Sequence, residues 1–424
     1  MSLEQKNTSF SLSALVLLFI ACFTFVTMDL WRDWHSGGTS MRSQRLNHYA
    51  FLPAAISNGG SFIFSTDEVN GLQHLPNGDK MSNETYGVAL MELPFFLIGR
   101  ILTEQGGKAD TGFGLNYLLS IHWGGIFYFL LGLILLRRFL QLYFNEKITS
   151  LTLLLTAFGT NMFYYGAGCV ETDQVYLFFL MAVLLNLIPD FMPQKSIMRS
   201  FGLGIVMGLI SLIRPSETWL LLLPFFWGIK NKGEAMDRFK EISRKPVYSV
   251  ILLIGIILIW TPQLIVWRRM TEDFFFGTGI ERNFYWTEPL IMNFLFGFRR
   301  GWIIYSPLIV FFLSGLYFMN GDWKWTRNVM IVGLLFLIYW NSCRWDYAEG
   351  GGFGARVMAH HLAWLSLPMA VLIRKMMNVS SGWPSIIMVV LFFMGIGLNL
   401  GQTYQHVRGY LHPDSQTMES YKYI

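Results

Sequence analysis

The sequence has 424 residues, of which 53% are hydrophobic and only 14% are charged. Soluble domains carry about a quarter charged residues, so these polar side chains are too few to cover a water-facing surface. Composition therefore excludes an ordinary soluble protein and predicts an all-α polytopic membrane protein with one membrane domain, residues 1–424. The net charge of +5 is typical of Lys and Arg in cytoplasmic loops, and we expect no nucleic-acid partner.

Apolar runs follow one another along the chain, and eleven of them are predicted to cross the membrane. The first is too long for a cleavable signal peptide and lacks a small-residue cleavage site, so we expect it to remain as an anchor. Two short segments flank Arg214-Pro215 and form either a tight hairpin or one kinked element, because proline interrupts a helix. The predicted spans are 10–31, 114–136, 150–166, 172–188, 200–213, 216–229, 247–267, 302–319, 328–342, 357–373 and 384–405.

Segment 86–103 is apolar but contains Glu92 and Pro94. If it lies in the membrane interface instead of crossing, all the short basic loops fall on one side, including 230–246. The excess of Lys and Arg then places these loops and the N-terminus in the cytoplasm. The outer side is predicted to contain the first loop (32–113), the second loop (268–301), the stretch 343–356 and the C-terminal tail (406–424).

Acids and arginines gather at the predicted outer ends of separate spans. Asp29 closes the first span, and Asp33 follows it. Glu171 and Asp173 open the fourth span, and Arg214 lies at the turn after 213. Ionisable groups at membrane depth are costly, so they usually mark function or paired charges. Ordinary interfacial charges are the alternative for each residue alone. The other candidates on this side are Arg300, Arg344, Arg356, His360, Gly352 and Gly354.

The stretch "CRWDYAEGGGFGARVMAHH" (343–361) interrupts the apolar sequence. Its glycines permit close backbone approach, and free N–H groups ahead of a helix that begins at Arg356 would form an anion site. A flexible turn with an interfacial arginine is the alternative. His360 could face the same cavity or bond a neighbouring helix. His360 and His361 are adjacent and are expected to face different directions, so no metal site is predicted.

Six stretches in this order resemble the GT-C superfamily of integral-membrane glycosyltransferases, which includes protein O-mannosyltransferases and aminoarabinose transferases. They are "HYAFLPAAISNGG" (48–60), "ETYGVALMELPFFLIGRIL" (84–102), "CVETDQVYLFFLMAVLL" (169–185), "GLISLIRPSETWLLLLPF" (208–225), "FGFRRGWIIYSPLIVFFLSGL" (296–316) and "WDYAEGGGFGARVMAHHLAWLSLPMAV" (345–371). The resemblance implies a large first outer loop with two juxtamembrane helices, here roughly 45–58 and 86–103. The resemblance to bacterial members also implies a bacterial inner-membrane location, and the charge distribution places the N-terminus in the cytoplasm and the C-terminus outside.

The resemblance further implies transfer of a sugar from a polyprenyl-phosphate-type carrier to a glycan, lipid or protein acceptor on the outer face. A carboxylate accepts the proton of the acceptor, and cations stabilise the leaving phosphate. Asp29 and Asp33 match the location of the family's first acid, and Glu171 and Asp173 match the second. Arg356 and Arg300, then Arg214 and Arg344, are expected to contact the phosphate. The donor is a substrate, no cofactor is predicted, and a metal requirement is left open.

Two other functions are compatible with the sequence. A transporter or flippase for a lipid-linked or anionic substrate would place charges near the bilayer midplane, often within inverted repeats. Here the charges lie at one edge and no repeat is evident. A non-catalytic assembly partner is the third interpretation, because 43–47 reads SQRLN where many relatives carry an acid.

Overall fold

The structure is a computed structural model of the chain, and it is all-α. Its β-strands in the described ranges are only two residues long, β1 (Gln73–His74) and β2 (Lys80–Met81), which pair antiparallel. The described residues are 11–31, 46–56, 72–75, 80–82, 84–106, 112–191, 196–274, 284–348, 352–378, 382–412 and 415–423.

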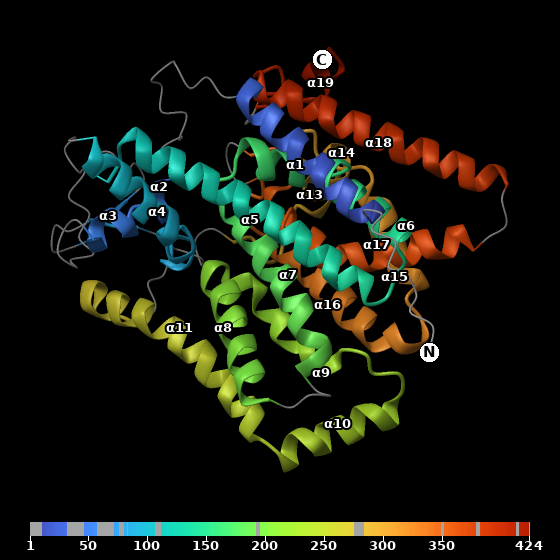
Figure 1. The fold of residues 1–424 in the computed structure, drawn as a ribbon, viewed down its shortest axis with the longest axis horizontal. Helices are drawn as coiled ribbons and strands as arrows, with labels where there is room; N and C mark the ends of the chain where they lie inside the picture. The colour runs from blue at the N-terminus through green and yellow to red at the C-terminus, as the bar shows by residue number, and fades with distance from the viewer. Residues whose placement is uncertain are drawn as a thin grey trace, which may run out of the picture.

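Long helices make up most of the molecule (Figure 1). They are α1 (Leu12–Trp31), α4 (Gly87–Gln105), α5 (Leu115–Gln141), α7 (Asp173–Phe191), α8 (Ile197–Ile213), α11 (Val247–Thr271), α16 (Lys324–Ser342), α17 (Leu362–Met377) and α18 (Trp383–Val407). Within the described ranges, α5, α11 and the Ile386–Val407 part of α18 are each long and apolar enough to cross a membrane. Shorter apolar helices lie at Leu12–Thr27, Asp173–Pro189, Ile197–Ile213 and Ile309–Phe318.

Four of the predicted spans are not continuous α-helices. One of them is 357–373, where the 3₁₀ turn η5 (Arg356–Met358) precedes α17. In 150–166, α6 (Glu146–Phe158) ends just before Gly159, and the π-helical turn η2 (Tyr164–Gly168) follows. In 302–319, α14 (Trp302–Tyr305) and α15 (Ile309–Phe318) are separated by Ser306-Pro307. Ser306 has φ −143° and ψ 66°, because a residue before proline avoids the α conformation.

The same effect breaks the chain before 216–229. Arg214 precedes Pro215 and is extended, with φ −137° and ψ 105°. The residues that follow form the 3₁₀-helix η3 (Pro215–Leu222) and the single turn α9 (Leu223–Phe226). The segments on either side of Arg214 are therefore an α-helix and a 3₁₀-helix joined by a sharp break.

The helices expected within the first outer loop are present. Segment 86–103 lies in α4, and 45–58 contains the short helices α2 (Leu46–Tyr49) and α3 (Phe51–Ile56). Tyr49, Phe51 and Phe96 pack with Tyr117 of α5 and Trp267 of α11 in a buried cluster of their own. The position of these helices relative to a membrane stays a prediction. The remaining elements are α10 (Lys232–Arg244), α13 (Ile291–Phe296), η4 (Gly321–Trp323), η5 (Arg356–Met358) and α19 (Met418–Lys422).

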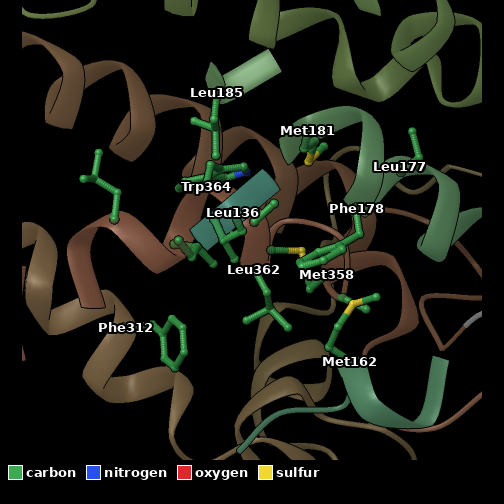
Figure 2. Close-up of a cluster of buried hydrophobic side chains, with 14 of the residues drawn as sticks. Leu136, Met162, Leu177, Phe178, Met181, Leu185, Phe312, Met358, Leu362 and Trp364 are labelled. Carbon is green, nitrogen blue, oxygen red and sulfur yellow. The ribbon is translucent and has the colours of Figure 1, made fainter. Parts of the chain in front are cut away.

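The main core is formed where α5, α6, α7 and α17 meet. Figure 2 shows Leu136, Phe178, Met358 and Trp364 packed at its centre, and each of them is at most 1% exposed. Another close contact joins α8 to α11, where a Cβ added at Gly204 would collide with the carbonyl oxygen of Leu252. Small residues allow helices to approach closely in this way, as they do in membrane bundles.

Segments predicted to be cytoplasmic meet at one end of the bundle. Arg137 donates to the hydroxyls of Ser11 (2.7 Å) and Ser13 (2.6 Å), which ties the start of α1 to the C-terminal part of α5. Lys230 pairs with Asp322 at 3.2 Å, which joins two further loops. In Figure 1 α6 and α10 lie at the right and bottom of the molecule, whereas α2 and α3 lie at the left. We name these two ends the basic end and the opposite end.

Candidate functional site

Asp173, Arg214 and Arg356 come together at the opposite end from three separate elements. Asp173 is the first residue of α7, Arg214 follows the last residue of α8, and Arg356 is the first residue of η5. The Arg214 Nε donates to the Asp173 carboxylate in an ion pair whose side chains are only 15% and 7% exposed. Arg356 and His48 also interact electrostatically with this carboxylate. The arrangement holds two guanidinium groups beside one buried acid, where they can contact an anion.

Glu171 lies close to this group along the chain, in the turn before α7. Its Oε1 is 2.9 Å from Nδ1 of His122, and both side chains are almost completely buried. His122 comes from the first half of α5, in the middle of a predicted span, and it was not among the candidates. A histidine inside an apolar run is the signal that identifies such a residue, because polar groups at that depth are costly unless they are paired.

Glu217, His360 and His361 form a second buried polar group. Nε2 of His360 is 3.4 Å from Glu217 Oε1, and Nε2 of His361 is 3.5 Å from the same oxygen. The expectation that the adjacent histidines face different directions is therefore wrong. It assumed regular α-helical geometry, but α17 begins only at Leu362, and the two rings lie against each other with centroids 4.2 Å apart.

The glycine–arginine loop differs from the expected anion site. Arg356 begins a three-residue 3₁₀ turn and not the α-helix. The backbone N–H of Phe353 donates to the hydroxyl of Tyr165 at 3.0 Å, so this N–H is already used within the protein. Gly354 has φ +61°, a conformation that favours glycine, and Gly352 packs directly on Tyr165. Close packing at Gly352 and the positive φ at Gly354 each favour glycine, and the role of these two residues in anion binding stays a prediction.

Two of the expected phosphate contacts lie at the junction between the second outer loop and the stretch 343–356. Arg300 is buried and donates to the carbonyl of Ala348. Arg344 forms an isolated β-bridge with Phe284. These contacts place both arginines where they connect the two segments.

The predicted base is only partly described. Asp29 belongs to the last turns of α1, but its side chain is outside the described residues, as is all of Asp33. Glu349, Gly350 and Gly351 are also outside them. The roles of Asp29 and Asp33 therefore stay predictions.

No protein-family model matches this chain, and no curated protein matches it. A function for this chain is consequently inferred from the residues themselves and from their resemblance to the GT-C superfamily.

Proposed function

We propose that the protein is an integral-membrane glycosyltransferase, which moves a sugar from a polyprenyl-phosphate-type carrier to an acceptor on the outer face. The observation that carries this proposal is the convergence of Asp173, Arg214 and Arg356 from three elements. It supports the proposal because the breaking sugar–phosphate bond places growing negative charge on phosphate oxygens, and guanidinium groups held nearby stabilise that charge.

Within this proposal, Arg356 and Arg214 contact the donor phosphate. Asp173 orients Arg214, since their ion pair is buried and leaves the guanidinium little freedom. Asp29, with Asp33 as its alternative, accepts the proton of the acceptor hydroxyl. Glu171 is the next acid to consider, and His122 holds its carboxylate in place.

The proposal includes a GT-C-like topology of about eleven spans, with the N-terminus and 230–246 in the cytoplasm and the C-terminus outside. Its support is the gathering of Lys and Arg at the basic end. Arg374 lies over the ring of Phe144 at 5.2 Å, and Tyr143 contacts Trp323 with ring centroids 4.9 Å apart. Loops far apart in sequence therefore share the end that the charge distribution assigns to the cytoplasm.

The test is a transfer assay with purified protein and a panel of radiolabelled polyprenyl-phosphate sugars. We expect label to move from the carrier to membrane lipid, glycan or protein. Asp29→Asn keeps the shape of the side chain but removes the proton acceptor, so turnover should fall by about 10²–10⁴. Asp322→Asn, at the basic end, is the matched control and should retain normal turnover.

One result would contradict the transferase activity, and another would contradict the assignment of the base. Movement of intact labelled lipid across the bilayer of a proteoliposome, without release of the sugar, would indicate a flippase. Near-normal turnover in both Asp29→Asn and Asp33→Asn would remove these residues from the mechanism, and Glu171 and Asp173 would become the candidates.

A further inference from the structure

We propose that Glu217, His360 and His361 bind a divalent transition-metal ion, with Zn²⁺ as the preferred ion. This inference is independent of the proposed transferase activity. Two imidazoles and one carboxylate form a donor set that proteins use for zinc. The three side chains are at most 2% exposed, and one ligand atom from each lies within 4.8 Å of the others.

The distances fit coordination better than direct hydrogen bonding. The separations of 3.4 Å and 3.5 Å between Nε2 atoms and Glu217 Oε1 exceed the usual range of about 2.7–3.2 Å for N–H···O bonds. Two ligands bound at about 2.0–2.2 Å from Zn²⁺ in tetrahedral geometry are about 3.3–3.5 Å apart. An ion between these atoms would therefore require little movement of the side chains.

Unsatisfied polar atoms point to the same site. Glu217 Oε2, His360 Nδ1 and His361 Nε2 are buried and have no hydrogen-bond partner among the described residues. Buried polar atoms are costly without a partner, and a metal ion relieves this cost for the ligand atoms it binds. Among these three atoms, Nε2 of His361 is the ligand atom in the proposed arrangement, so coordination supplies the partner that it lacks.

Trp364 forms a hydrogen bond that competes with coordination of a metal ion by His361. Its indole N–H donates to Nδ1 of His361 at 3.0 Å, so the ring proton of neutral His361 lies on Nε2. Coordination through Nε2 moves that proton to Nδ1 and breaks the indole hydrogen bond. Trp364 therefore competes with the metal, and its replacement by phenylalanine should tighten Zn²⁺ binding by about fivefold.

The position of the ligands gives the ion a structural role. Glu217 lies three residues after Arg214, and His360 lies four residues after Arg356. An ion that joins η3 to the start of α17 also fixes the distance between the segments that carry these two arginines. Arg214 interacts electrostatically with His360, and its pairing with Asp173 reduces repulsion of the cation.

The experiment measures metal bound to the full chain, purified in detergent with its affinity tag removed, equilibrated with Zn²⁺ and then dialysed. We expect about one Zn²⁺ per chain by elemental analysis. Glu217→Gln and His360→Asn should each reduce this content at least about tenfold. His122→Asn is the matched control, because His122 is equally buried beside a glutamate, and it should leave the content unchanged.

A second measurement decides the question even if the variants fold poorly. Wild-type protein equilibrated with Co²⁺ should show the visible absorption bands of Co²⁺ bound by nitrogen and oxygen, and Zn²⁺ should remove them. The proposal is wrong if the wild-type chain retains no metal and shows no Co²⁺ spectrum, or if folded Glu217→Gln and His360→Asn keep full metal content. Unchanged or weaker Zn²⁺ affinity in Trp364→Phe would contradict coordination by His361.

Discussion

The buried ion pair between Asp173 and Arg214 makes the stability of the opposite end sensitive to a single substitution. Removal of one partner leaves an uncompensated charge in a place from which water is largely excluded. We predict that Asp173→Asn lowers the free energy of unfolding by about 3–5 kcal/mol. The measurement is thermal or chemical unfolding of the purified protein in detergent.

The double variant Asp173→Asn/Arg214→Gln tests the origin of this loss. Because it removes both charges, it should be more stable than Asp173→Asn alone. Glu104→Gln is the control, since its pair with Arg100 is exposed and should contribute less than about 1 kcal/mol. Strictly additive effects of the two substitutions would show that the carboxylate and the guanidinium are not coupled.

Contact between α8 and α11 depends on the absence of a side chain at Gly204. A Cβ there meets the backbone of Leu252, whereas a Cβ at Gly202 in the same helix meets nothing within 4 Å. We predict that Gly204→Ala destabilises the protein by about 1–3 kcal/mol, because the two helices must separate. Gly202→Ala should be neutral or slightly stabilising, since alanine favours helix. Equal melting temperatures for the two variants would contradict this packing.

Glu146, the first residue of α6, is a titratable residue that accepts hydrogen bonds from Ser13 of α1. Burial raises the pKa of Glu146. Hydrogen bonds from the side chain and backbone of Ser13 and the charge of Arg137 lower the pKa and outweigh the effect of burial, so the pKa lies below its ordinary value. This contact therefore adds stability above the unfolded pKa of about 4.3, and the contribution disappears as pH falls through the lower folded pKa.

The corresponding prediction compares the wild-type protein with Glu146→Gln across pH. The wild-type protein should melt at a higher temperature near neutral pH, and the difference should shrink as the solution becomes more acidic than about pH 4. A difference that stays constant from neutral to acidic pH would mean that ionisation of Glu146 does not stabilise the junction.

At the scale of the whole molecule, orientation in the membrane is testable by cysteine labelling. In a background where Cys22, Cys169 and Cys343 are serine, Arg238→Cys should resist a membrane-impermeant thiol reagent in intact cells, because 230–246 is predicted to be cytoplasmic. Glu104→Cys, at an exposed position near the end of α4, should react. Labelling of position 238 from outside would reverse the topology.

Much of the fold follows from the sequence. A long apolar run has no water to bond its backbone N–H and C=O groups in a bilayer, and a helix satisfies these groups within the segment. The positions of α5, α11 and α18 are predictable for this reason. The break at Arg214 was predicted from Pro215, and the break at Ser306 could have been found from Pro307 in the same way. The contacts of His122 with Glu171, and of Glu217 with His361, could not be found, because they join residues far apart in the chain.

Part of the predicted site comes together in the structure, because the ends of the predicted spans could be read from the sequence. Asp173, Arg214 and Arg356 each lie at the end of a predicted span, and span ends on one side meet in a bundle. Gly352 and Gly354 lie in a loop that Tyr165 and Asn161 hold through hydrogen bonds to the carbonyl of Phe353, and their role in anion binding stays a prediction. A glycine-rich pattern does not distinguish close packing from ligand binding.

The most direct test of the account is the binding of polyprenyl phosphate to the protein in nanodiscs. Arg356→Lys keeps the charge but loses the planar fork, so affinity should fall about tenfold. Arg238→Lys makes the same change at the basic end and should bind as the wild-type protein does. The account predicts that the wild-type protein binds the lipid and that only Arg356→Lys is weakened. Absence of binding to the wild-type protein, or equal affinity in the two variants, would contradict it.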